Sequence, residues 1–95
     1  MLREFAMSKG QFTSATIEAK IFELLAARRP GATICPSEVA RALEAEAWRP
    51  LMPQIRQVAQ SLADANRIVV TRSGAPVDAT QPGGPIRLRS VSNNG

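Results

Sequence analysis

The fold is decided by residues 33–73, which read TICPSEVARALEAEAWRPLMPQIRQVAQSLADANRIVVTRS. Thr33 and Ile34 have strand character, but two residues need a neighbouring strand edge to pair with. A helix start follows, because Pro36 fits the first helical position and the carboxylate of Glu38 favours a helix N-terminus. The segment therefore predicts a short strand that leads directly into a helix.

A second helix follows a joint that contains Trp48, the single tryptophan of the chain. At about 100° per residue, the apolar side chains beyond the joint fall on one arc of a helix over about residues 50–65. These are Leu51, Met52, Ile55, Val58, Ala59, Leu62 and Ala65. Asn66 is placed to end the helix in a left-handed conformation, a position that glycine usually takes.

Two strands complete the pattern. Residues 68–71 alternate in strand fashion, and a second strand at 85–89 follows a loop rich in glycine and proline. Upstream, a stripe at helical spacing predicts a first helix, which Thr13 or Ser14 can cap. The stripe consists of Ile17, Ile21, Leu24 and Leu25. The predicted fold is mixed α/β but mostly α: a winged helix-turn-helix with three helices and a small antiparallel β-hairpin wing.

The 95 residues are enough for one small domain with one core. We expect a flexible N-terminal arm over 1–13, the winged-helix domain over 14–90 and a disordered tail over 91–95. The core is predicted from the apolar faces of the expected helices and strands. Its members are Ile21, Leu25, Val39, Leu43, Ile55, Val58, Leu62, Ile68 and Ile86.

Composition argues against several classes of function. The chain has no histidine, so Ser-His-Asp and Cys-His catalysis are impossible, and a metal site is improbable with Cys35 as the single cysteine. No glycine-rich loop opens a helix, so no phosphate loop is expected. We therefore predict no enzyme, no cofactor and no metal. Cys35 is interpreted as a small buried residue, with redox sensing as the alternative.

Neither a membrane span nor a secretory signal is visible, and a cytoplasmic protein without membrane partners is expected. The net charge is +4, and ten of the twelve basic residues are arginine. The charge is uneven: residues 36–47 carry a net −2, whereas residues 48–72 carry a net +3. Arginine suits phosphate and guanine contacts, although a genome rich in G and C would also favour arginine codons.

The polar face of the expected third helix is the main candidate site. Glutamine can bind adenine and arginine can bind guanine or phosphate, although any exposed helix also needs polar residues. The four side chains on this face are Gln54, Arg56, Gln57 and Gln60. Three arginines of the expected strands, Arg72, Arg87 and Arg89, are candidates for contacts with phosphate; a charged edge that prevents aggregation is the alternative.

Trp48 is interpreted as the apolar anchor of the joint, with a stacking role as the alternative. Arg49 beside it could pair with a helix carboxylate or contact phosphate. Acidic residues of the second expected helix would suit a protein partner instead. They are Glu38, Glu44 and Glu46.

Four stretches resemble a small bacterial family that is known only as a domain of unknown function. They are ICPSEVAR at 34–41, WRPLM at 48–52, Ile55-Arg56, and GPIRLR at 84–89. The resemblance covers about residues 15–90 and implies a winged-helix fold, but no activity and no functional residues. Asn66 departs from the glycine that the family usually has there, which a left-handed asparagine can replace.

The predicted function is a small DNA-binding module, as a transcriptional regulator or another DNA-associated protein, with duplex DNA as its partner. A homodimer or a protein partner is compatible with this prediction. The alternative is a winged-helix adaptor that binds proteins and no nucleic acid. The modest net charge and the acidic second helix keep that alternative open.

Overall fold

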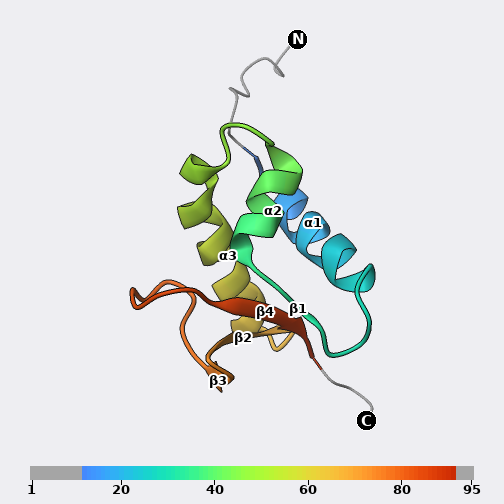
Figure 1. Ribbon diagram of the computed structural model, residues 1–95, viewed down its shortest axis with the longest axis vertical. Coiled ribbons are helices and arrows are strands. Elements are labelled where there is room, and N and C mark those ends of the chain that lie inside the picture. The colour runs from blue at the N-terminus through green and yellow to red at the C-terminus, as the bar shows by residue number, and fades with distance from the viewer. Residues whose placement is uncertain (1–11, 92–95) are drawn as a thin grey trace.

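The computed structural model describes residues 12–91, a mixed α/β domain with three α-helices on one side of an antiparallel sheet (Figure 1). In chain order the elements are α1 (Ser14–Ala26), β1 (Thr33–Ile34), α2 (Pro36–Leu43), the 3-10 helix η2 (Arg49–Leu51), α3 (Met52–Asp64), β2 (Ile68–Arg72), β3 (Ala75–Pro76) and β4 (Arg87–Ser90). The predicted arm and tail lie largely outside the described residues. Within residues 12–91 no helix is both long and apolar enough to cross a bilayer.

Local signals set the ends of the helices. Thr13 caps α1 by accepting a hydrogen bond from the Thr16 N–H at 3.1 Å. At the end of α3, Asn66 has φ 61°, as its position predicted. The N–H of Asn66 donates to the Ala63 carbonyl at 2.9 Å, and the N–H of Arg67 donates to the Leu62 carbonyl at 2.8 Å. These two bonds form a Schellman motif, which turns the chain from α3 into β2.

The sheet is larger than the predicted hairpin. Its four strands have the order β1-β4-β2-β3, and every neighbouring pair is antiparallel. The two residues of β1 are stable as a strand because Thr33 pairs with Arg89 and Ile34 pairs with Leu88. Between β2 and β3 the chain reverses in two residues, Ser73 and Gly74, which both have positive φ. This is the backbone of a type I′ turn, which matches the twist of the flanking strands.

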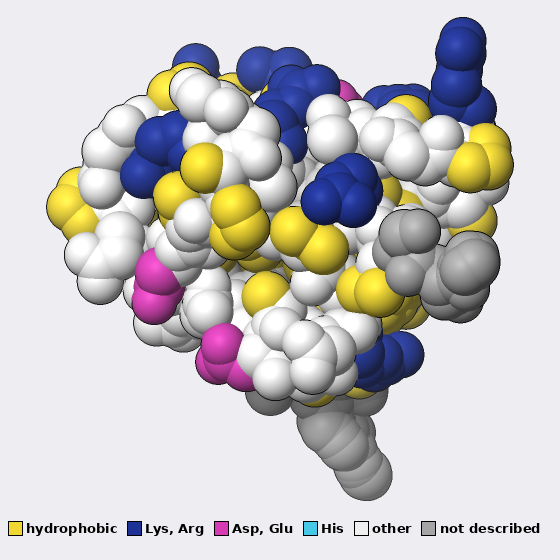
Figure 2. Space-filling model, turned by 90° about the horizontal axis from the view of Figure 1, so that it is seen from below, with side chains coloured by type: hydrophobic (Ala, Val, Ile, Leu, Met, Phe, Trp, Pro, Cys, Tyr) yellow, Lys and Arg dark blue, Asp and Glu magenta, His cyan; other side chains and the backbone are white. Residues whose placement is uncertain are grey.

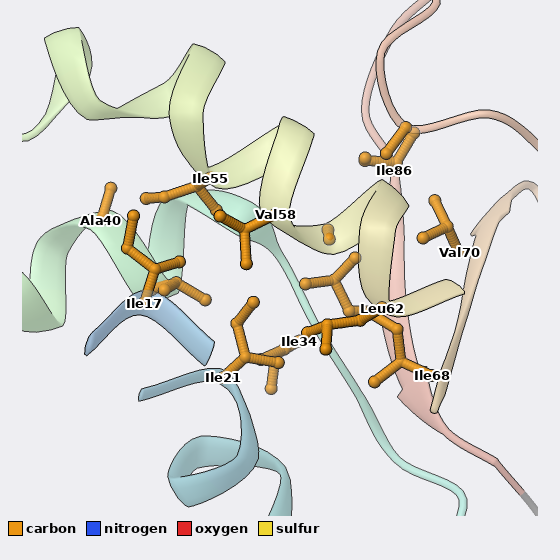
Figure 3. Packing of buried hydrophobic residues seen from close by; sticks show 14 of the residues in the cluster. Ile17, Ile21, Ile34, Ala40, Ile55, Val58, Leu62, Ile68, Val70 and Ile86 are labelled. Carbon is orange, nitrogen blue, oxygen red and sulfur yellow. The ribbon is translucent and has the colours of Figure 1, made fainter. Parts of the chain in front are cut away.

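A single core joins the helices to the inner face of the sheet (Figure 3). Eight of the nine predicted core residues are buried, and Leu43 is half-buried against the same cluster. Ile68 and Val70 of β2 and Leu88 of β4 line the sheet side of this core. Because strand residues alternate between faces, the side chains between them point away from the helices. This parity decides where each strand arginine lies.

Candidate functional site

The helix α3 has one buried and one exposed face. Its buried face consists of Ile55, Val58, Ala59 and Leu62. On the opposite side, Pro53, Gln57, Ser61 and Asp64 are exposed. The 3-10 helix η2 leads directly into α3, and the apolar residues Leu51 and Ile55 of the two elements pack into the core. The opposite face of α3 is left exposed to solvent. An exposed helix face of about three turns is therefore available to a partner.

The four polar residues predicted on this face take different positions. Gln54 and Arg56 are two residues apart, so their side chains leave the helix about 160° apart. Gln54 is half-buried on one flank, where its side-chain amide donates to the Phe12 carbonyl at 2.8 Å. Arg56 is half-buried on the other flank, and Gln57 is exposed between them. Gln54 thus fastens the segment before α1 to α3.

Gln60 fastens a loop to α3. Its side-chain oxygen accepts a hydrogen bond from the Ala79 N–H at 2.7 Å, and its side-chain nitrogen donates to Asp64 at 2.8 Å. Ala79 is completely buried, so its N–H cannot bind water, and the Gln60 oxygen supplies the acceptor that water would otherwise provide. The loop between β3 and β4 is therefore held against the exposed end of α3, and Thr80 lies next to the helix.

The loop and the N-terminal half of α3 line a shallow, open cavity of about 280 Å³. Its lining consists of Met52, Pro53, Arg56, Gln57 and Thr80. The lining combines a thioether and a proline ring with a guanidinium, an amide and a hydroxyl group. Such a site can hold a flat apolar group and offer hydrogen-bond donors to acceptor atoms at its edge.

The position of Thr80 was not predicted from the sequence. Asp78 shapes this part of the loop, because its carboxylate accepts hydrogen bonds from both the hydroxyl and the N–H of Thr80. The hydroxyl bond is the main cause, and the N–H bond a further cause, of a lowered pKa for the Asp78 carboxyl. The spacing Asp78-x-Thr80 is a local signal for such a turn. The contact of this loop with α3 is not local, because it depends on the bond between Ala79 and Gln60, which are 19 residues apart.

Arg72 is turned toward the loop between β3 and β4. One of its terminal nitrogens lies 3.4 Å from the Gln81 carbonyl and 3.3 Å from the Gly84 carbonyl. Gly83 covers the guanidinium so closely that a Cβ at this position would lie 2.9 Å from a nitrogen of Arg72. The Nε atom of Arg72 is buried without a partner among residues 12–91. The side chain is therefore positioned to support the loop.

Arg87 and Arg89 lie on the other face of the sheet. Arg87 pairs with Thr71 across the sheet, and Arg89 pairs with Val69, so both arginines point away from the helices. Arg87 is exposed and donates to the Thr33 hydroxyl at 2.9 Å. The structure thus separates these two arginines from Arg72, and from the cavity on α3. Figure 2 shows the end of the molecule that carries the sheet, with basic side chains gathered mainly along one half of the view.

Three further candidates, Cys35, Glu38 and Trp48, also have partners in the fold. Cys35 is half-buried, not buried as expected, and its sulfur lies 3.0 Å from a terminal nitrogen of Arg87. Glu38 forms a salt bridge with Arg28, which joins the start of α2 to the chain after α1. Trp48 is half-buried and packs against the core at the joint, in agreement with the anchor interpretation.

Comparison with known families identifies the domain. Residues 14–91 match the family described as protein of unknown function (DUF3253). The match covers most of the chain, so the protein belongs to this family. A comparison with curated proteins gave no match.

Proposed function

We propose that this protein is a winged-helix domain that binds duplex DNA through α3, in a regulatory or another DNA-associated role. The order of its elements supports the proposal: two helices joined by a short turn are followed by a hairpin that continues into a longer loop. In domains of this type the second helix of the pair enters the major groove. Here that helix is α3, and its outer face is exposed.

The observation that carries the proposal is the cavity between α3 and Thr80. Arg56 can donate two hydrogen bonds to guanine or to a phosphate, and Gln57 can bind adenine through its amide. Met52 and Pro53 offer apolar contact of the kind that a thymine methyl group makes. The exposed face of α3 therefore offers both polar and apolar groups to base edges, and the net positive charge of the chain favours a polyanionic partner.

The proposed contact set is narrower than the seven residues predicted from the sequence. Gln54 and Gln60 hold neighbouring segments in place, and Arg72 supports the loop, so these three side chains position the surface. Arg56 and Gln57 are assigned direct contacts. Arg87 and Arg89 form a second basic surface, on the face of the sheet that points away from the helices.

A comparison of two arginine variants tests the proposal. Binding of fluorescein-labelled random duplex is measured by anisotropy at several salt concentrations; non-specific affinity should lie at about 10⁻⁴–10⁻⁶ M and fall with salt. Arg56→Ala should weaken binding and reduce the salt slope by about one unit. Arg87→Ala removes the same charge from the other face and should have the smaller effect. Equal effects would indicate that net charge, and not α3, carries the binding.

The second candidate function is a protein-binding adaptor. Glu44 and Glu46 favour it, because neither forms a salt bridge within residues 12–91, whereas Glu38 does. The two acidic side chains lie after the end of α2, in the segment that leads to Trp48. If no duplex binds at low salt, the adaptor function replaces the DNA-binding function.

A further inference from the structure

Two arginines stack on the single tryptophan at the joint before α3. The guanidinium carbons of Arg41, in α2, and Arg49, in η2, lie 4.6 and 4.5 Å from the centroid of the Trp48 ring. Both arginines are exposed, whereas the ring is half-buried against the core. The tryptophan therefore holds two positive charges in place at the surface, because a cation over an aromatic ring is attracted to it.

The positive charge of this cluster is not compensated within the part of the chain that the structure describes. Neither Arg41 nor Arg49 forms a salt bridge there. Arg67 provides the contrast: it stacks on Phe22 at 4.8 Å, but it also lies 3.8 Å from a carboxylate oxygen of Glu18. Two cations that share one ring repel each other, so a bound anion would lower the free energy of the cluster.

The cluster lies at the N-terminal end of α3, because η2, which contains Arg49, leads directly into this helix. Arg49 precedes Arg56 by seven residues, which is about 10 Å along a helix. Met52 and Pro53, which line the cavity, lie between the two arginines in the sequence. A duplex whose groove received α3 would bring its sugar–phosphate backbone past the N-terminal end of the helix.

We propose that Arg41 and Arg49, held on Trp48, bind phosphate groups of the DNA backbone beside the groove that receives α3. This inference rests on the proposed function. Both guanidinium groups lie over the ring, and the N–H groups of an arginine can bind a phosphate in bidentate geometry. The contact does not depend on base sequence, so it fixes the position of α3 on the duplex while Arg56 and Gln57 contact the bases.

An acidic residue in the loop before Trp48 provides a test of whether the cluster binds a negatively charged group. Glu46 is exposed and precedes Trp48 by two residues, so its carboxylate would repel a phosphate at the cluster. Glu46→Gln should therefore tighten DNA binding. A loss of DNA affinity in this variant would show that the Glu46 carboxylate does not repel the bound DNA, which would overturn the phosphate assignment at this cluster.

The main experiment uses the full chain and two independent signals. Anisotropy of a labelled random duplex reports binding, and emission of Trp48, the single tryptophan, reports events at the cluster. Arg41→Ala and Arg49→Ala should each weaken binding on the order of tenfold at 50 mM salt and lower the salt slope by about one unit. Arg67→Ala is the matched control, since it also removes one charge and one aromatic contact; it should bind as the parent does.

The outcomes separate phosphate binding by the cluster from the proposed function. If the parent binds DNA but its Trp48 emission is unchanged and both cluster variants behave like Arg67→Ala, phosphate binding by the cluster is wrong and DNA binding by α3 stands. If no duplex binds, both proposals fail. If poly-glutamate binds as tightly as the duplex and changes Trp48 emission equally, the cluster recognises carboxylates of a protein, and the phosphate assignment is overturned.

Folding of the variants is controlled by circular dichroism and thermal unfolding. Arg41→Lys and Arg49→Lys serve where an alanine variant fails to fold, because lysine keeps the positive charge but cannot form a bidentate contact with phosphate. Each lysine variant should retain the salt slope of the parent and lose part of its affinity. A lysine variant that binds as tightly as the parent would show that the cluster contributes only charge, which would overturn the bidentate contact with phosphate.

Discussion

The substitution Leu62→Ala tests how the helices are joined to the sheet. Leu62 lies in the C-terminal half of α3 and is 3% exposed. Its side chain packs in the cluster that contains Ile34 of β1, Ile68 of β2 and Ile21 of α1 (Figure 3). Removing it should leave a cavity at the place where the helical layer meets the sheet.

The expected loss follows from the size of the buried group. Truncation removes three carbon atoms, and at about 0.8 kcal/mol for each buried methylene the lost transfer energy is about 2.4 kcal/mol. The cavity adds to this loss, and buried leucine-to-alanine changes in general cost about 2–5 kcal/mol. We expect about 3 kcal/mol, which is a large part of the stability of a small domain.

Urea denaturation followed by circular dichroism measures this loss. With a slope of about 1–3 kcal/mol per molar urea, the midpoint should fall by about 1–3 M. The melting temperature should fall by about 12–24 °C, at about 4–8 °C for each kcal/mol. Ser61→Ala, on the exposed side of the same helix, is the control and should stay within about 0.5 kcal/mol of the parent. An equally small loss for Leu62→Ala would mean that the phase of α3 is wrong.

Three further substitutions test the loop between β3 and β4. Gln60→Ala should destabilise the domain by about 1–3 kcal/mol in urea denaturation, because the buried N–H of Ala79 loses its acceptor; Gln60→Glu keeps an acceptor and should lose less. Gly83→Ala should cost about 1–3 kcal/mol by the same measurement, because its φ of 141° strains an L-residue and its Cβ would press on Arg72; an unchanged midpoint would contradict this packing. Because the folded-state pKa of Asp78 is lowered, its carboxylate stabilises the fold above the ordinary aspartate range, and this contribution disappears as the pH falls through the folded-state pKa. The gap in urea midpoint between the parent and Asp78→Asn should therefore narrow between pH 7 and pH 3, and a constant gap would show that the carboxylate has no role.

The helices were predictable because their signals are local. Thr13 caps α1 by a bond to a residue three positions away, and the two bonds that end α3 at Asn66 and Arg67 span only three and five residues. Apolar spacing identified the buried face of α3 for the same reason, since the helical period needs no knowledge of the partner. The pairing of Thr33-Ile34 with a sheet edge was expected too, but the four-strand order was not, because pairing joins segments that are distant in sequence.

The candidate site was predictable only as a set of residue types. Gln54 and Gln60 have the same polar character as Gln57, but their partners, Phe12 and Ala79, lie 42 and 19 residues away, and no local pattern reveals such bonds. Arg72 and Arg87 both belong to strands, but strand parity and register place them on opposite faces of the sheet. A linear sequence thus specifies which side chains can donate and accept, whereas the folded chain determines which of them remain free, because long-range contacts use up their hydrogen-bonding capacity.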